Sequence, residues 1–209
     1  IKPPGATDHK YIRGLLGIVA GAMPGASLLA ASAAQRAGAG YVKLLAQAPD
    51  PRTPAEIVTD TAPLADALAD PRMAAVLFGP GLGRDGTART MLGEALRGAP
   101  ALVLDAAALM LLVPADLGRD VPILATPHDG ELETLCRNFG IIAESRRDRA
   151  LALAKVSGMV VLAKGPDTLI AAPDGRLALA PPAPSWLSVA GTGDVLAGIL
   201  AAYLALTAT

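Results

Sequence analysis

Short apolar runs alternate with alanine-rich stretches of helical length along most of this chain, and this alternation limits the folds that it can adopt. Residues 15–20, 75–78 and 101–104 are apolar runs of strand length, whereas 25–36 and 87–96 have the length and composition of helices. Such alternation is typical of a mostly parallel sheet covered by helices. We therefore expect an α/β fold with a mostly parallel central sheet.

The same reasoning assigns the remaining elements. We expect strands at 15–20, 41–46, 56–59, 75–78, 101–104, 121–125, 159–163, 168–172 and 176–179, and helices at 25–36, 64–68, 87–96, 131–138, 145–157 and 195–206. Pro173-Asp174-Gly175 is a good hairpin turn between the last two strands. In the helix at 145–157, residues 146–149 are expected to form a charged face.

Composition bounds the class of protein. The 209 residues, of which 52% are hydrophobic, predict a single domain over 1–209, with a loose segment at 1–10. A net charge of −1 without a basic block argues against nucleic acid and anionic membranes as partners. Cys136 is the single cysteine and is expected in the core, which fits a reducing cytoplasm. The apolar stretch 195–206 is shorter than the ~20 residues that span a bilayer, and we see no leader, so we expect a cytoplasmic protein.

Glycine-rich and polar residues follow the predicted strands at their carboxyl ends. Gly21, Gly79 to Gly83, Asp105, His128 to Glu131 and Lys164-Gly165 occupy such positions. Ligands of open parallel sheets bind along this edge. We therefore expect these five strings to contribute to one site.

Gly191-Thr192-Gly193-Asp194 precedes the last apolar helix. Unpaired backbone N–H groups at a helix N-terminus attract phosphate. A carboxylate there repels an anion, so Asp194 makes better sense as a base that deprotonates a hydroxyl attacking phosphorus. The alternative is a glycine turn in which Asp194 is the N-cap.

Thr126-Pro127-His128-Asp129-Gly130-Glu131 places a histidine and two acids after a strand. Neutral His128 could hydrogen-bond a ligand, and Glu131 could hold Mg²⁺ through water. The alternative is an N-cap at Asp129, with Glu131 favourably placed in the first helical turn.

Three further strings have a functional and a structural interpretation each. The loop Gly79-Pro80-Gly81-Leu82-Gly83 allows close backbone approach to a ligand or is a tight connector, and its spacing is neither a Rossmann fingerprint nor a P-loop. Lys164 either reaches a nucleotide or is an exposed turn lysine. Asp105 either orients water or magnesium or caps a helix at 106–112.

The ordered set of these motifs resembles the ADP-dependent NAD(P)H-hydrate dehydratases, a branch of the ribokinase-like superfamily. The resemblance covers residues 9–206 and rests on Ala37 to Gly40, Gly79 to Gly83, Asp105-Ala106, Thr126 to Glu131, Lys164-Gly165 and Gly191 to Gly198. It implies a three-layer αβα fold and the dehydration of hydrated NADH or NADPH, coupled to hydrolysis of ADP or ATP with Mg²⁺. It also implies a homo-oligomer and an N-terminal epimerase domain or partner, which the start at Ile1 would suit.

Site residues follow from the resemblance position by position. The nucleotide-binding residues that it implies are Lys164, Gly165, Pro166, Asp167, Thr168, Gly191, Thr192 and Gly193, and the substrate-binding residues are Ala26, Gly83, His128 and Asp194. Asp194 is the implied catalytic base, which activates the ring hydroxyl of the hydrated coenzyme for attack on the terminal phosphorus. Glycine amides at the last helix would stabilise the developing charge.

Two other functions stay open. A small-molecule kinase of the same superfamily, acting on a vitamin precursor or a sugar, usually carries Asn-x-x-Glu in mid-chain, and we find no such string. A catalytically silent nucleotide-binding domain is the second alternative, because the loop 21–26 is short and lacks the family's aromatic residue, and 184–187 replaces its Asn-x-Gly-Met. The chain also ends one helix after Asp194, where relatives continue.

Overall fold

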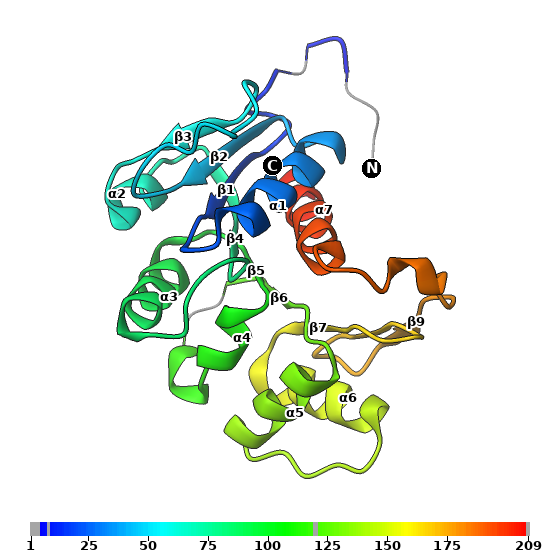
Figure 1. Ribbon diagram of the computed structural model, residues 1–209. Coiled ribbons are helices and arrows are strands. Elements are labelled where there is room, and N and C mark those ends of the chain that lie inside the picture. Colours follow the sequence, from blue (N-terminus) through cyan, green and yellow to red (C-terminus); the bar gives the residue numbers. More distant parts are fainter. Residues whose placement is uncertain (1–4, 8, 119–120, 208–209) are drawn as a thin grey trace.

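The computed structural model describes residues 5–7, 9–118 and 121–207 and consists of a single twisted sheet with helices on both faces (Figure 1). Its elements are β1 (Leu15–Val19), α1 (Pro24–Arg36), β2 (Tyr41–Leu45), β3 (Val58–Asp60), α2 (Leu64–Leu68), β4 (Met73–Phe78), α3 (Gly86–Gly98), β5 (Leu102–Leu104), α4 (Ala107–Leu111), β6 (Ile123–Ala125), α5 (Asp129–Asn138), α6 (Arg146–Ser157), β7 (Val160–Ala163), β8 (Leu169–Ala171), β9 (Leu177–Leu179) and α7 (Thr192–Thr207). Short 3₁₀ turns occur at Pro114–Asp116 and Ser185–Leu187.

The nine strands lie in the order β3-β2-β1-β4-β5-β6-β7-β8-β9. All neighbours from β3 to β7 pair in parallel, and β7, β8 and β9 pair antiparallel. The expected α/β fold with a mostly parallel sheet is therefore confirmed, as is the hairpin at its end.

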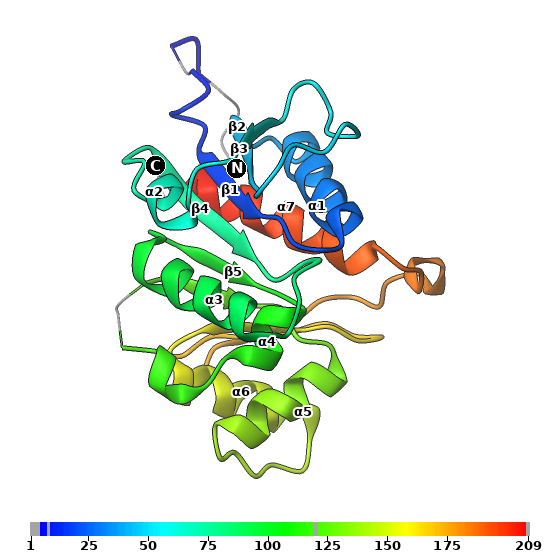
Figure 2. The same cartoon turned by 60° about the vertical axis from the view of Figure 1, so that its left-hand side comes forward.

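Two hydrophobic cores form on opposite faces of the sheet because side chains of a strand alternate between its faces. Leu15 and Val19 of β1 point into a core shared with α2 to α6, whereas Leu16 and Ile18 point into a core closed by α1 and α7. Figure 2 shows α1 and α7 together on one side and α3 to α6 on the other. Cys136 is buried in the first core, as expected.

Helices α1 and α7 pack closely because the residues between them are small. Gly198 lies so near the backbone of Ala30 that a Cβ there would collide with the Ala30 carbonyl oxygen. Ala201 and Ala205 continue the buried stripe of α7, while Tyr203 on its outer side is 43% exposed. No helix in the described ranges has the length and apolarity needed to cross a bilayer.

The strand order reverses at β1, whose neighbours are β2 on one side and β4 on the other. The chain leaves β1 toward α1 on one face and leaves β4 toward α3 on the other, so the helices that follow these strands lie on opposite faces of the sheet. This topological switch point is where ligands of open α/β sheets bind.

Most element bounds agree with the sequence-based expectation, with shifts of two or three residues at the ends of some elements. The strand expected at 56–59 is β3 at Val58–Asp60, and the one expected at 121–125 is β6 at Ile123–Ala125. Helix α5 begins at Asp129, two residues earlier than expected, and α7 begins at Thr192, three residues earlier.

Candidate functional site

The loops at the switch point pack backbone against backbone. The amide of Met23 donates to the carbonyl oxygen of Gly81 (3.0 Å), and Gly21 lies against Gly81 and Leu82 too closely for a Cβ. Gly81 has φ +72°, a conformation that favours glycine. The glycines therefore permit a close approach between the two loops, whereas the approach to a ligand stays a prediction.

A second tight contact fixes the end of β5. Gly79 has φ +130°, and a Cβ there would collide with the backbone carbonyl of Asp105. Ala106, which follows, has φ +48°, a conformation that non-glycine residues adopt at a cost in energy. Backbone packing thus holds the position of Asp105 within narrow limits.

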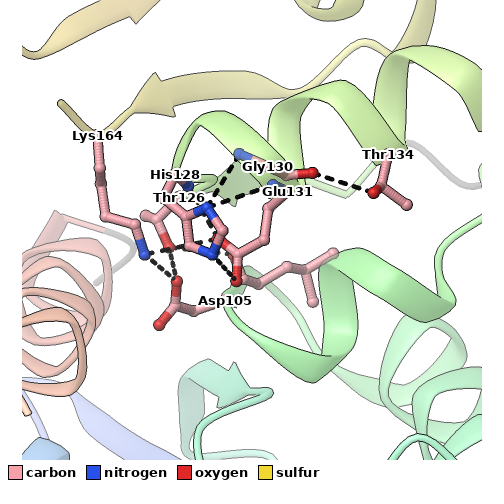
Figure 3. Close-up of polar contacts among 8 residues, drawn as sticks. Asp105, Thr126, His128, Gly130, Glu131, Thr134 and Lys164 are labelled. Atoms are coloured by element: carbon pink, nitrogen blue, oxygen red, sulfur yellow. Dashed lines mark hydrogen bonds and ion pairs between the residues drawn. The ribbon is translucent and has the colours of Figure 1, made fainter. Parts of the chain in front are cut away.

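A buried ion pair forms around Asp105, whose side chain is 3% exposed. Its Oδ1 accepts hydrogen bonds from Nζ of Lys164 (2.7 Å) and Oγ1 of Thr126 (2.8 Å), and Figure 3 shows these side chains pointing toward one another. Nζ of Lys164 also lies 3.9 Å from Oε2 of Glu131. A buried carboxylate needs such partners because isolated charge is costly to bury.

Two structural interpretations of these residues are therefore wrong. Lys164 is not an exposed turn lysine, since its side chain is 20% exposed and paired with Asp105. Asp105 does not cap α4 with its side chain, because Ala106 is the residue at that cap and no side-chain hydrogen bond is made there.

His128 and Glu131 form a reciprocal cap at the start of α5. Nδ1 of His128 accepts from the amides of Gly130 (3.1 Å) and Glu131 (3.4 Å), and Oε2 of Glu131 accepts from the amide of His128 (2.8 Å). The N-cap is therefore His128, and the alternative with Asp129 as N-cap is wrong. Because Nδ1 accepts, neutral His128 carries its proton on Nε2, which lies 3.5 Å from Oε1 of Glu131 and belongs to a side chain that is 62% exposed and accessible to a ligand.

Asp194 is the third residue of α7 and is half-buried. It lies inside the first helical turn, so its interpretation as the N-cap is wrong. Burial raises the pKa of its carboxyl, the negative charge of Asp105 raises that pKa further, and Lys164 opposes both effects. A carboxyl with a raised pKa at a helix start is suited to accept a proton.

Burial also raises the pKa of Glu131, against the opposing effects of the His128 amide and of Lys164. A Cβ on Gly193 would lie 3.7 Å from Nζ of Lys164, so the start of α7 reaches the same ammonium group. Three carboxylates and one lysine thus interact at the carboxyl edge of the sheet.

The turn between β7 and β8 carries the other predicted nucleotide-binding residues. Gly165, Pro166 and Asp167 are exposed, and Thr168 is half-buried. The amide of Lys164 donates to the carbonyl of Pro127 (2.7 Å), which ties this turn to the segment before α5.

Ala26 and Gly83 lie on the other side of the switch point. Gly83 lines an open cavity of about 1100 Å³, together with Gly21, Pro24 and Ser27. The cavity extends over the ends of β2 and β3, and neither His128 nor Asp194 lines it. The structure thus gathers Lys164, Gly193 and Asp194 with Asp105, and places Ala26 and Gly83 in a neighbouring group joined to it through Gly79.

Sequence reasoning missed Thr126 as the partner of Asp105 and missed the contacts of Arg146. The side chain of Arg146, a member of the expected charged face of α6, is 20% exposed and contacts the Lys164 to Thr168 turn. Helical spacing was the available signal, because Arg146 shares a face with buried Ala150 and Leu153.

The chain has a ribokinase-like fold. The structure superposes on a ribokinase-like superfamily protein from Enterococcus faecalis with a TM-score of 0.84 and 23% identity, covering 99% of this chain and 76% of that one. It superposes on the ADP/ATP-dependent NAD(P)H-hydrate dehydratase from Bacillus subtilis, co-crystallised with ATP and Mg²⁺, with a TM-score of 0.78 and 26% identity over 99% of this chain and 82% of that one.

Sequence relatives narrow the class. Residues 16–209 match the family model of NAD(P)H-hydrate dehydratase. The ADP-dependent (S)-NAD(P)H-hydrate dehydratase of Xanthomonas campestris is 36% identical over 97% of this chain and 76% of its own length. The chain belongs to the NAD(P)H-hydrate dehydratase family, as the motifs predicted. The bifunctional NAD(P)H-hydrate repair enzyme of Mycobacterium leprae is also 36% identical, and this chain spans 43% of its length.

Proposed function

We propose that this chain catalyses the ADP-dependent dehydration of hydrated NADH or NADPH, returning the damaged coenzyme to its active form. The observation that carries the proposal is the half-buried Asp194 at the start of α7, electrostatically coupled to the buried pair of Asp105 and Lys164. A base and a cation beside a helix N-terminus are what transfer of a phosphoryl group to a hydroxyl requires.

In the proposed reaction, Asp194 takes the proton of the hydroxyl group on the nicotinamide ring. The oxygen of that hydroxyl group attacks the terminal phosphorus of ADP. The bond from that phosphorus to AMP breaks, and AMP leaves. The bond between the ring carbon and the phosphorylated oxygen then breaks, driven by the electron pair of the ring nitrogen. Phosphate leaves and carries that oxygen with it. Loss of a proton from the adjacent ring carbon restores the double bond.

The nucleotide would lie between the β7–β8 turn and the start of α7. Gly165 to Asp167 are exposed, and the amides of Gly191 and Gly193 would offer donors for phosphate oxygens, whereas the amide of Thr192 donates to the carbonyl oxygen of Val189 (3.4 Å). Lys164 would hold its ammonium group beside the phosphates because that group donates a hydrogen bond to the buried Asp105 carboxylate.

The hydrated coenzyme would contact Ala26, Gly83, His128 and Asp194. Nε2–H of His128, whose side chain is 62% exposed, can donate to the substrate. The cavity beside Gly83 has the volume to hold a further part of the dinucleotide.

Magnesium fits this site as a companion of the nucleotide. No group of three or more acidic, histidine or cysteine side chains in the described part of the chain could hold a metal by itself. The carboxylates of Asp105, Glu131 and Asp194 outnumber the single ammonium of Lys164, so anionic phosphates need additional positive charge. Mg²⁺ commonly binds through phosphates, waters and one or two carboxylates, and Glu131 is the carboxylate that we propose to hold it through water. When bound, it would neutralise phosphate charge.

The remaining parts of the proposal concern the cellular setting. We propose a cytoplasmic homo-oligomer that acts with an N-terminal epimerase domain or partner, without nucleic acid or membrane partners. The relatives named bifunctional support a second activity beside this one.

The test is to incubate hydrated NADH with the protein and ADP and to follow recovery of the NADH absorbance. We expect recovery that depends on ADP and releases one phosphate per coenzyme. A kinase of the same superfamily would leave the hydrate untouched. For a silent nucleotide-binding domain, wild type and Asp194→Asn would bind ADP equally and both lack turnover, whereas we expect Asp194→Asn to lose about 10²–10⁴-fold in rate.

A further inference from the structure

Arg146, at the start of α6, reaches across to the nucleotide turn formed by residues 164–168. Its Nη2 donates to the carbonyl oxygen of Ala163 (2.6 Å), and its Nη1 donates to the carbonyl oxygen (2.7 Å) and Oδ1 (3.1 Å) of Asp167. Ala163 directly precedes the turn and pairs with Leu169 in the β7–β8 ladder, and Asp167 is the fourth of the five turn residues. One guanidinium group therefore bridges the residue before the turn and the fourth residue within it.

The guanidinium also fills the space beside Gly165. A Cβ on Gly165 would lie 2.6 Å from Cζ of Arg146 and 2.8 Å from Nη1, so the glycine backbone rests directly on the planar group. Hydrogen bonds and packing thus fix the turn residue next to Lys164.

The same side chain joins this turn to the other half of the site. Nε of Arg146 lies 2.9 Å from Oδ1 of Asp129, the first residue of α5 and the neighbour of His128. The contact is an ion pair whose angle is too bent for a good hydrogen bond. Arg146 therefore connects the predicted nucleotide turn with the segment that positions His128.

Charge gives a second reason for an arginine here. The side chains of Asp129 and Asp167 are 69% and 52% exposed, and Arg146 is paired with both. Without it, two uncompensated carboxylates would face an approaching anionic nucleotide. A lysine could neutralise charge but could not reproduce the planar fork that meets three acceptors.

We propose that Arg146 is a positioning residue that preorganises residues 164–168 for the nucleotide phosphates. This rests on the proposed function, because it takes that turn as the nucleotide site. The start of α6 does not depend on Arg146, since Oγ of Ser145 caps the helix by accepting from the amide of Asp148 (3.0 Å). We therefore expect the removal of Arg146 to lower the affinity for the nucleotide and to leave helix α6 formed.

The experiment compares Arg146→Met and Arg146→Lys with Arg147→Met, the exposed neighbour on the same turn of α6. ADP binding is measured by titration calorimetry without coenzyme, together with the KM values, kcat and the thermal midpoint. We expect Arg146→Met to raise the Kd and KM of ADP about tenfold to a hundredfold, the range for loss of charged hydrogen bonds. The Kd and KM of ADP for Arg146→Lys should lie between those of wild type and those of Arg146→Met, and the values for Arg147→Met should match wild type.

We expect kcat at saturating ADP and the KM of the hydrated coenzyme to change less than about threefold, because unsupported turn residues can still be ordered by bound nucleotide. A folded Arg146→Met that binds ADP like wild type would overturn the proposal. An equal loss of ADP and coenzyme affinity would also overturn it, since this indicates general damage. If Arg146→Met does not fold, the proposal would be overturned by an Arg146→Lys variant that binds ADP with wild-type affinity.

The two proposals fail in different ways. A wild-type protein that binds ADP but leaves hydrated NADH unchanged would refute the dehydratase reaction, while the Kd comparison would still decide the role of Arg146. A wild-type protein that binds neither ADP nor ATP would refute both.

Discussion

Removing the ammonium group of Lys164 should destabilise the protein through the carboxylate that it leaves behind. In Lys164→Met, the Asp105 carboxylate keeps one neutral donor, Oγ1 of Thr126 at 2.8 Å, in a position only 3% exposed. Removing one partner of a fully buried pair costs about 3–5 kcal/mol of unfolding free energy. Lys164 is 20% exposed, which admits some water, so we expect about 2–3 kcal/mol at neutral pH.

The complementary change, Asp105→Asn, should cost less. The amide can still accept from Thr126, and the ammonium of Lys164 keeps Glu131 at 3.9 Å. We expect about 1–2 kcal/mol for this change and a double variant that is less destabilised than the sum of both by about 1–2 kcal/mol.

The assay is a double-mutant cycle measured by urea unfolding at pH 7 with wild type, both single variants and the double variant. A coupling free energy of the expected size means that each side chain stabilises the protein mainly through its interaction with the other. Single-variant effects that add to within about 0.5 kcal/mol would refute the interpretation of the pair as a buried, mutually dependent ion pair.

Two further predictions concern the base and the packing beneath it. Because burial and Asp105 raise the pKa of Asp194, its carboxylate is protonated and inactive at a higher pH than an ordinary aspartate, so kcat/KM should fall as pH falls through that raised pKa. Asp105→Asn removes a negative charge and should move this acidic limb to lower pH; a limb that stays in place would contradict the assignment of Asp194 as base. Gly79→Ala should destabilise by more than about 2 kcal/mol in urea unfolding, because Gly79 has φ +130° and faces the Asp105 carbonyl. Gly86→Ala, in open space at the first residue of α3, is the control and should be neutral to within about 1 kcal/mol, whereas equal effects of the two changes would count against the tight contact at Gly79.

Sequence periodicity predicted most elements because each buried strand is a short apolar run bounded by turn residues. The bounds of α2 at Leu64–Leu68 agree in full with the expectation. The edge strand β3 was displaced because it is half-exposed, so its apolar signal is weak. The position of the candidate site at the carboxyl ends of the strands was predicted from the parallel direction of the strands, because ligands of open parallel sheets bind along that edge.

Pair contacts in the site could not be predicted in the same way. Lys164 and Asp105 are 59 residues apart, and no local pattern indicates which distant acid a lysine will meet. Asp129 was considered as the N-cap of α5 because aspartate is a common capping residue and histidine is not, yet Nδ1 of His128 takes that role. The contacts of Arg146 were missed because a charged face by itself indicates no partner, although the helical spacing of Arg146 matches the buried residues of α6.

The most direct test of Asp194 as the base that activates the ring hydroxyl follows the oxygen atom. Hydrated NADH is prepared with a heavy oxygen isotope in its hydroxyl group and converted by the protein with ADP in ordinary water. We expect the label to appear in the released phosphate, one atom per molecule, at a rate that Asp194→Asn lowers. Unlabelled phosphate, with the heavy oxygen found in water, would show that the hydroxyl never attacks phosphorus and would contradict the proposed mechanism.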